Sequence, residues 1–278
     1  MIKAVKNYDV VIIGAGPAGI FTALELADKG YTILMVEKGQ DIRDRIATSV
    51  NPQALAKDKV RNVVCGWGGA GAFSDGKLTL TTEFGGNLDD YMSQAELAEK
   101  IKYVDSVYCR FGGADRKVYG DENPEEIRRI QRRAAAADLR FIPARIRHLG
   151  TDVNAQILTN MRDFLDGKAD ILSDTAVEHI VVEDGTVRGV IIDGQLYGCQ
   201  YLVAAPGREG SEWFVGEVEQ MGLSLTSNAV DIGVRVEMPA EIFEPITDIL
   251  HESLWLCRHG KQRRPFDGQW PQLCSQAQ

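Results

Sequence analysis

The stretch DVVIIGAGPAG, residues 9–19, places a short β-branched run directly before the glycine spacing G-x-G-x-x-G. Residues 8–13 predict a strand that is buried on both faces of a parallel sheet. Residues 18–29 carry apolar side chains at helical spacing, and residues 31–36, YTILMV, predict a second buried strand. The segment 8–37 therefore predicts a β-α-β unit.

The glycines of this unit have separate expected roles. Gly14 allows the tight turn, Gly16 lets a pyrophosphate approach the backbone, and Gly19 lets the helix pack closely on the sheet. The helix N-terminus offers free N–H groups and the positive end of the helix dipole to the anion. Because strand, loop, helix and second strand agree, the segment predicts a dinucleotide site instead of a purely structural turn. The residues expected to contact the dinucleotide here are Gly14, Ala15, Gly16, Pro17, Ala18 and Gly19.

An acidic residue, Glu37, ends the second predicted strand, 18 residues after Gly19. Its carboxylate is placed to accept hydrogen bonds from ribose hydroxyls, and its charge disfavours a 2′-phosphate and so an NADP-type ligand. The structural alternative is a solvated acid at a strand end. We also expect its neighbour Lys38 to contact the cofactor. The fingerprint alone does not separate FAD from NAD.

Composition excludes several classes of protein. The 278 residues include 31 Lys and Arg and 40 Asp and Glu, so the net charge is −9, which disfavours nucleic acid as a partner. The five cysteines are odd in number and form no Cys-x-x-Cys pair, which argues against a disulfide framework and a zinc site. No apolar stretch approaches the roughly 18 residues that span a bilayer. We expect a cytoplasmic protein that has no metal and is not embedded in a membrane.

Further along the chain, residues 65–76, CGWGGAGAFSDG, form a second glycine-rich segment. Between the β-α-β unit and this segment we expect a polar helix over 41–60, and after the segment two further helices over about 123–137 and 153–165. Residues 169–205 are rich in β-forming residues, with hairpin turns expected at Asp184-Gly185 and Asp193-Gly194. The tail from about residue 255 is rich in glutamine and does not resemble the end of a folded domain.

Several blocks of the sequence resemble a known family. DVVIIGAGPAG at 9–19, Glu37 and YLVAAPGREG at 201–210 resemble the flavoproteins with two dinucleotide-binding folds. More closely, CGWGGAGAFSDGKLTL at 65–80, APGREGSEW at 205–213 and DIGVRVEMPAEIF at 231–243 are similar to bacterial and archaeal FAD-dependent dehydrogenases. The similarity covers about residues 8–253. It implies an α/β fold, the three-layer FAD/NAD(P)-binding Rossmann-like type, with an inserted α+β substrate-type domain and without the C-terminal part of that fold.

The resemblance implies a division of the chain into five parts. They are an FAD-binding β-α-β unit with a flavin loop at 1–80, a mainly helical inserted segment at 81–168, a β-meander with a strand returning to the FAD domain at 169–210, part of the substrate domain at 211–253, and an atypical, disordered tail at 254–278.

The resemblance also implies further cofactor-binding residues. A small loop that follows the first β-α-β unit runs along the flavin, and here it holds Gly68, Gly69, Ala70, Gly71 and Ser74. The alternative is a tight turn around bulky neighbours such as Trp67 and Phe73. Val177 matches the position whose backbone pairs with adenine, although it is equally well explained as an ordinary apolar strand residue. Gly207 matches the glycine that ends the strand returning to the nucleotide sheet.

The catalytic residues are not assigned by the sequence, and two weak candidates stand out. His148 follows Arg145 and Arg147, where it could act as a proton donor or bind an anionic substrate; a hydrogen-bonded structural histidine is the commoner case. Lys77 follows the flavin loop, and a cation at the flavin would favour the anionic reduced form. The alternative for Lys77 is a solvent-exposed lysine.

Three functions follow from these patterns. The first is an FAD-dependent oxidoreductase that transfers hydride or electrons between an unknown small molecule and flavin, with NAD(P)H open as electron partner. The second is an NAD-binding dehydrogenase. The third is a shortened flavoprotein fragment or binding module, because the resemblance implies a C-terminal Gly-Asp segment, and the family-like sequence stops near 250–253, as a shifted reading frame would produce. The sequence leaves the substrate, the electron partner and the oligomeric state open.

Overall fold

The computed structural model describes residues 4–51, 53, 63–226, 237–250 and 254–258. The chain forms two compact units. The first unit consists of residues 1–76, 111–113 and 150–226, and the second consists of residues 77–110, 114–149 and 227–278. These boundaries differ from the expected ones at 80 and 168.

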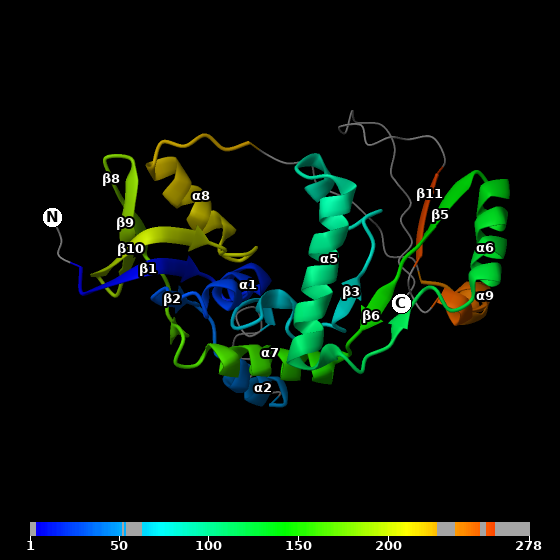
Figure 1. Ribbon diagram of the computed structural model, residues 1–278, viewed down its shortest axis with the longest axis horizontal. Helices are drawn as coiled ribbons and strands as arrows, with labels where there is room; N and C mark the ends of the chain where they lie inside the picture. Colours follow the sequence, from blue (N-terminus) through cyan, green and yellow to red (C-terminus); the bar gives the residue numbers. More distant parts are fainter. Residues whose placement is uncertain (1–3, 52, 54–62, 227–236, 251–253, 259–278) are drawn as a thin grey trace. The chain divides into compact units, whose positions relative to one another are not determined.

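The first unit is built on a six-stranded mixed sheet with the order β7-β2-β1-β10-β9-β8 (Figure 1). The four strands from β7 to β10 are parallel, while β9 and β8 run antiparallel to their neighbours. The elements of this unit are β1 (Lys6–Ile13), α1 (Pro17–Leu26), β2 (Ile33–Val36), α2 (Ile42–Ser49), the 3₁₀ turn η1 (Gly69–Gly71), α7 (Thr151–Leu165), β7 (Asp170–Leu172), β8 (His179–Glu183), β9 (Thr186–Ile192), β10 (Gln195–Ala204) and α8 (Ser211–Gln220).

The central strands of this sheet are buried on both faces, as their apolar runs predict. All four residues of β2 are buried, and so are the last four residues of β1. On one face α1 packs against β1 and β2. On the other face Trp213 of α8 packs against the cluster that contains Val11 and Leu34. The unit therefore has three layers, and the expected α/β class is confirmed.

The antiparallel edge of the sheet is made by two tight hairpins. Asp184 and Asp193 have φ angles of 52° and 48°, and the glycine after each also has a positive φ. Two consecutive residues with positive φ are typical of type I′ turns, whose twist matches that of paired strands. The predicted Asp-Gly turns therefore join β8 to β9 and β9 to β10.

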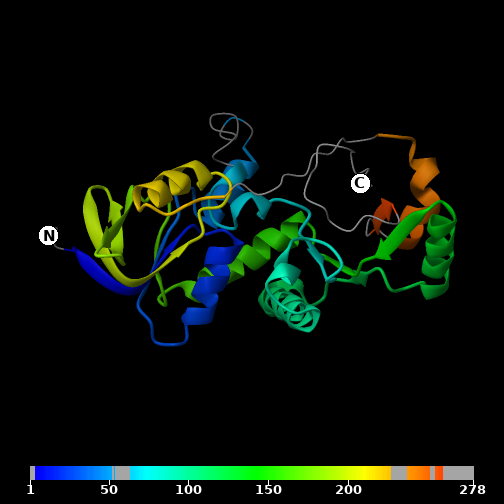
Figure 2. The same ribbon diagram turned by 90° about the horizontal axis from the view of Figure 1, so that it is seen from above.

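Helix α7 belongs to the first unit, although the sequence suggested that it was part of an inserted segment at 81–168. Its buried face includes Ile157, Leu158 and Met161. This face explains the difference, because α7 packs against α1 and α2, and both views show α1 and α7 side by side (Figures 1 and 2). Of the predicted helix over 41–60, the structure shows α2; residues 54–60 lie outside the described residues.

The second unit contains strands as well as helices, so the prediction that residues 81–168 are mainly helical was incomplete. One sheet has the order β3-β6-β4, and β11 pairs with β5. The elements are β3 (Lys77–Thr79), η2 (Leu88–Asp90), α5 (Gln94–Tyr108), β4 (Val118–Tyr119), α6 (Pro124–Ala136), β5 (Leu139–Pro143), β6 (Ile146–His148), α9 (Ala240–Leu250) and β11 (Leu254–Arg258). The π-turn η3 (Cys109–Gly113) follows α5, and its last three residues belong to the first unit.

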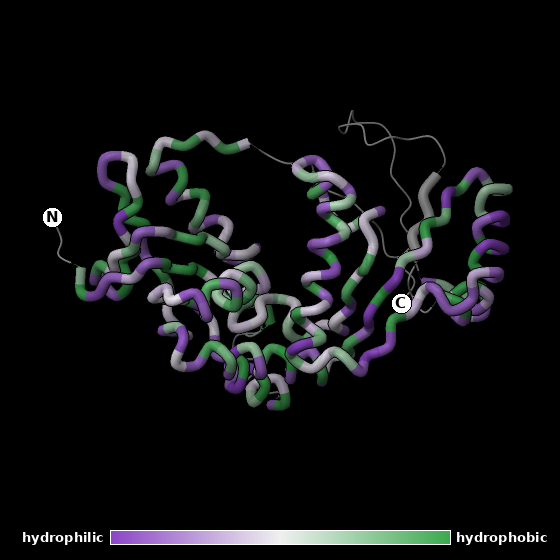
Figure 3. The backbone as a smooth tube through the Cα atoms, in the orientation of Figure 1, coloured by the Kyte–Doolittle hydropathy of each residue, from purple (hydrophilic) through white to green (hydrophobic). Residues whose placement is uncertain are grey.

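A small core of its own holds part of the second unit together. Ile127 and Ile130 lie on one face of α6 and pack with Phe141 of β5 and Leu250 of α9. The rest of α6 is largely hydrophilic (Figure 3). The five residues of β11 belong to the tail that was expected to be disordered, but they pair with β5; residues 259–278 lie outside the described residues.

The first core predicts a clear stability difference between two variants. Leu34 is fully buried, so Leu34→Ala is expected to lower the free energy of unfolding by about 2–5 kcal/mol through lost burial and a residual cavity. Val5 is 61% exposed, so Val5→Ala is expected to change it by no more than about 0.5 kcal/mol. Urea unfolding followed by circular dichroism measures both; equal effects would contradict the assignment of this core.

Candidate functional site

The candidate site lies at the carboxyl edge of the parallel strands. In the sheet register Ile13 is level with Val36 of β2 and Ala204 of β10. The Gly14 N–H donates to the Val36 carbonyl at 2.8 Å, and the Ala205 N–H donates to the Ile13 carbonyl at 2.8 Å. Because neighbouring parallel strands end together, segments far apart in the sequence meet at one edge, where ligands bind in open α/β sheets.

The first glycine loop has two crowded positions, Gly14 and Gly19, and one open position, Gly16; a Cβ on Gly19 would lie 1.9 Å from the Gly14 carbonyl oxygen. Gly14 has a φ of 97°, and a Cβ there would clash with the carbonyl oxygen of Ala205. At Gly16 a Cβ would meet no atom within 4 Å. Among the described residues, no group accepts a hydrogen bond from the N–H of Gly16, Ala18 or Gly19. Free N–H groups beside open space at the start of a ten-residue helix suit a pyrophosphate.

Glu37 lies at the end of β2 and binds backbone. Its carboxylate is 7% exposed and accepts hydrogen bonds from the N–H groups of Ala15 at 2.7 Å, Gly39 at 2.8 Å and Gly66 at 3.0 Å. The interpretation of Glu37 as a solvated acid was therefore wrong. A carboxylate offers about four acceptor positions, so these bonds leave about one, on Oε2, for a ribose hydroxyl.

The second glycine loop, residues 63–76, lies directly against the first. The Gly68 N–H donates to the Ala15 carbonyl at 2.8 Å, and a Cβ on Gly69 would lie 3.3 Å from the Gly16 Cα. In the described part of the chain, no group accepts from the N–H of Ala70 or Gly71. The two loops that were expected to face one cofactor are thus neighbours.

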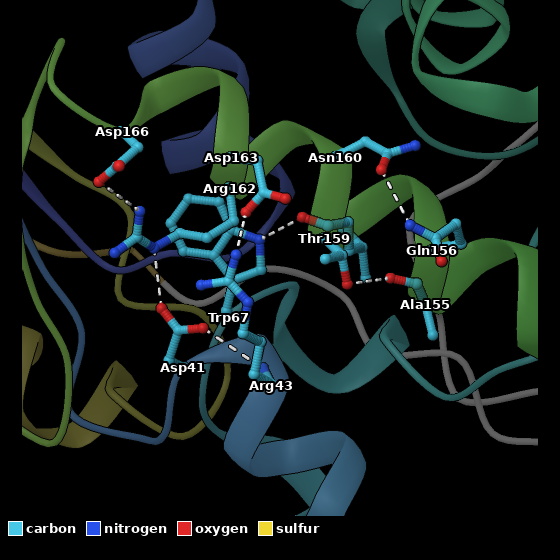
Figure 4. Close-up of polar contacts among 11 residues, drawn as sticks. Asp41, Arg43, Trp67, Ala155, Gln156, Thr159, Asn160, Arg162, Asp163 and Asp166 are labelled. Carbon is cyan, nitrogen blue, oxygen red and sulfur yellow. Dashed lines mark hydrogen bonds and ion pairs between the residues drawn. The ribbon is translucent and has the colours of Figure 1, made fainter.

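Trp67 anchors the second loop from inside the unit. Its side chain is fully buried and its indole Nε1 donates to the Leu158 carbonyl of α7 at 3.0 Å. Figure 4 shows Trp67 beside Arg162, whose guanidinium carbon is 5.8 Å from the indole ring centroid and whose Nε binds Asp41 at 2.8 Å. The alternative of a tight turn around a bulky neighbour therefore describes the inner side of this loop correctly.

Ser74 and Lys38 have protein partners, and their expected contacts with a cofactor stay predictions. The Ser74 hydroxyl donates to the Gly71 carbonyl at 2.8 Å, so its single proton closes a turn within the loop. Lys38 forms an ion pair with Glu209. Lys38 lies just after β2, whereas Ser74 lies just after η1 in the second glycine loop.

Val177 and Gly207 keep features that suit a cofactor. The Val177 side chain is buried in the core of the first unit, as the apolar alternative predicts, yet no other described residue hydrogen-bonds to its backbone. This free N–H and C=O leave its expected pairing with adenine available. Gly207 follows β10, has a φ of 64° and would meet no atom within 4 Å if it carried a Cβ.

The two catalytic candidates, Lys77 and His148, belong to the second unit. They are paired directly across the antiparallel strands β3 and β6, so their side chains share one face of that sheet. Residues 146–148 form the strand β6. Arg147 binds Asp105 through two bonds of 2.6 and 2.9 Å, which raises the pKa of its guanidinium. The catalytic roles of Lys77 and His148 stay predictions.

The described residues contain no group of three or more His, Cys, Asp or Glu side chains that is arranged to hold a metal ion. None of the helices that the structure describes is both long and apolar enough to cross a membrane.

Comparison with known proteins identifies the first unit. Residues 9–60 match the family model described as FAD dependent oxidoreductase. Over this segment the chain is similar to the FAD-dependent oxidoreductases. The cofactor of its dinucleotide site is accordingly FAD, and no comparison supports the alternative of NAD at this site.

Individual relatives match the chain over different lengths. An uncharacterized protein of Clostridium beijerinckii is 30% identical over 237 residues, which is 84% of this chain and 37% of the relative. A digeranylgeranylglycerophospholipid reductase of Methanosarcina mazei is 49% identical over 53 residues, 18% of this chain and 13% of the reductase. Glycine oxidase from Geobacillus kaustophilus is 15% identical, with a TM-score of 0.46 over 80% of this chain and 60% of the oxidase. The chain thus spans little more than a third of the Clostridium relative.

Two residues of this site were not predicted from the sequence. Arg45 of α2 and Asn154 of α7 are both buried and both hydrogen-bond to carbonyls of the second glycine loop. Each occurs within a predicted helix, where a polar residue usually indicates a solvated face. Their partners are backbone atoms, which leave no pattern in the side chains of the sequence.

The glycines of the first loop predict a contrast between two variants. Gly14→Ala is expected to cost roughly 2 kcal/mol or more of unfolding free energy, because of its positive φ and the clash with Ala205. Gly16→Ala, at a φ of −76°, is expected to fold normally but to bind FAD about tenfold more weakly or worse, because the methyl group fills the open space. Thermal melting and FAD titration measure the two effects. Tight FAD binding by a folded Gly16→Ala variant would exclude a pyrophosphate at this position.

Glu37 predicts an effect that does not need the cofactor. Glu37→Gln places an NH₂ group against one of three backbone N–H donors, so the apoprotein is expected to lose about 1–3 kcal/mol of unfolding free energy. Urea unfolding of apoprotein provides the measurement, and Glu25→Gln, on an exposed part of α1, provides the control. If Glu37 served only the ribose, the stability of the apoprotein would not change.

Proposed function

We propose that this protein is an FAD-dependent oxidoreductase that transfers hydride or electrons between a small-molecule substrate and the flavin. One observation carries the proposal: the N–H groups of Gly16, Ala18 and Gly19 have no partner among the described residues, and the space beside Gly16 is open. This arrangement fits the pyrophosphate of a dinucleotide, and the family match of residues 9–60 specifies which dinucleotide it is.

The residues of the first unit would hold FAD along its length. The start of α1 would bind the pyrophosphate, the backbone of Val177 would pair with adenine, and Glu37 has about one acceptor position left for the ribose. The N–H groups of Ala70 and Gly71 would meet the flavin end. FAD supplies the redox chemistry when bound, and the protein supplies position and electrostatics.

The substrate is proposed only as a small molecule. The name of the Methanosarcina reductase refers to a phospholipid, but that match covers only 18% of this chain. A match of this length is comparable to the 9–60 segment that matches FAD-dependent oxidoreductases in general, so it does not specify a substrate. NAD(P)H is a candidate electron partner, separate from the dinucleotide site. The net charge of −9 supports a function without nucleic acid.

We further propose that the protein works in the cytoplasm without insertion into a membrane. The cysteine pattern supports this location, because five cysteines without a Cys-x-x-Cys pair do not suit the disulfide framework of a secreted protein. In the part of the chain that the structure describes, Cys65, Cys109 and Cys199 form no disulfide.

The proposal predicts a flavin spectrum. The purified chain is expected to show the two visible absorption bands of bound flavin, or to gain them when FAD is added to the apoprotein. Calorimetric titration is expected to give tighter binding for FAD than for NAD, because the fingerprint segment is of the FAD-dependent type. The Gly16→Ala variant serves as the control for specific binding. A folded wild-type chain that takes up no FAD would refute the proposal.

A further inference from the structure

Arg45 is a buried cation whose hydrogen-bonding groups point at backbone. It lies on α2, and its side chain is 1% exposed. Nη1 donates to the carbonyls of Trp67 at 2.6 Å and Gly69 at 3.0 Å, and Nη2 donates to the carbonyl of Val63 at 3.0 Å. One guanidinium thus binds three carbonyls of the second glycine loop.

The surroundings of Arg45 are shaped around its side chain. A Cβ on Gly66, whose φ is 101°, would lie 2.5 Å from Arg45 Cδ, so this position accepts only glycine while the arginine is in place. The Phe73 ring centroid lies 5.1 Å from the guanidinium carbon. A planar fork of donors on an aromatic face is a geometry that arginine provides and lysine does not.

Arg45 and Glu37 act on the loop with opposite charges. Glu37 accepts from the Gly66 N–H, while Arg45 donates to carbonyls on both sides of that residue. Burial lowers the pKa of the Arg45 guanidinium, and the nearby Glu37 carboxylate opposes this effect. Arginine stays protonated in proteins, and charge-assisted hydrogen bonds are strong where water is excluded.

The carbonyl bonds determine which way the loop presents its N–H groups. The carbonyls of Trp67 and Gly69 are turned toward Arg45, and the next N–H groups along the chain, those of Ala70 and Gly71, have no partner among the described residues. A second residue, Asn154 of α7, holds the far end of the loop by donating to the carbonyls of Gly71 and Ala72, each at 3.0 Å.

We propose that Arg45 is a positioning residue for FAD: it holds the carbonyls of Val63, Trp67 and Gly69 toward its guanidinium so that the N–H groups of Ala70 and Gly71 are presented to the cofactor. This inference rests on the proposed function. It adds to that function a residue that acts through the backbone of the loop and does not touch the cofactor.

The test compares Arg45→Lys and Arg45→Met with wild type in the full-length chain. Arg45→Lys keeps the charge but cannot bridge three carbonyls, and Arg45→Met keeps much of the apolar volume. Arg43→Lys is the matched control, because Arg43 lies on the same helix, is exposed and pairs with Asp163 on α7 (Figure 4). Circular dichroism melting identifies which variants are folded, and Arg45→Lys retains the test if Arg45→Met does not fold.

Three measurements report on the folded variants. In the apoprotein, hydrogen exchange of peptides that cover residues 63–74 is expected to be about tenfold faster in the Arg45 variants and unchanged in Arg43→Lys. The FAD dissociation constant is expected to rise about tenfold or more in the Arg45 variants. At saturating FAD, the visible absorption and circular dichroism bands of the flavin bound to the Arg45 variants are expected to shift, because the N–H groups of the loop would be oriented differently toward the flavin.

The outcomes separate the two proposals. Unchanged exchange of the loop, or unchanged FAD affinity and spectrum, in a folded Arg45→Lys variant would overturn the role of Arg45. A wild-type chain that does not bind FAD would overturn the proposed function, and with it the proposal that the loop presents N–H groups to FAD. In that case hydrogen exchange of residues 63–74 in the apoprotein would still decide whether Arg45 holds the loop. A general loss of stability with an unshifted flavin spectrum would show that Arg45 is structural only.

Discussion

The rest of the site depends on the hydrogen bonds of one buried carboxylate, that of Glu37. It accepts from Ala15 in the first glycine loop, from Gly39 after β2 and from Gly66 in the second loop. A buried carboxylate is costly unless its acceptors are occupied, so these three segments stabilise Glu37 as much as it stabilises them. Glu37 thereby joins loops that lie 22 and 29 residues away from it in the sequence.

The second glycine loop is held from two sides by groups of opposite polarity. Glu37 takes an N–H group at Gly66, whereas Arg45 and Asn154 supply donors to its carbonyls. A loop with few side chains has little packing of its own to define its shape, so its backbone groups must be satisfied by the structure around it. The glycine-rich composition of this segment is therefore matched by polar residues that are buried elsewhere in the unit.

The parallel strands bring these groups together. Strands β7, β2, β1 and β10 end at one edge, so the loop after β1, Glu37, the segment around Val177 and the approach to Gly207 gather there. At this edge Lys38 forms an ion pair with Glu209, and in the second glycine loop the Ser74 hydroxyl donates to the Gly71 carbonyl. The sequence did not predict these partners, because they depend on which protein groups the fold brings close to the two side chains.

The sequence by itself determined the β-α-β unit, the two Asp-Gly hairpins and the first glycine loop, because each is encoded by short-range signals: apolar periodicity, backbone freedom at glycine and turn preference. Only the tertiary structure decided that α7 packs in the first unit, that Glu37 binds three backbone N–H groups, and that Arg45 turns inward to the second loop. Those outcomes depend on contacts with backbone atoms distant in the chain. Nearly every residue has the same backbone N–H and C=O groups, so the local sequence does not indicate which side chain will hydrogen-bond to a given backbone group.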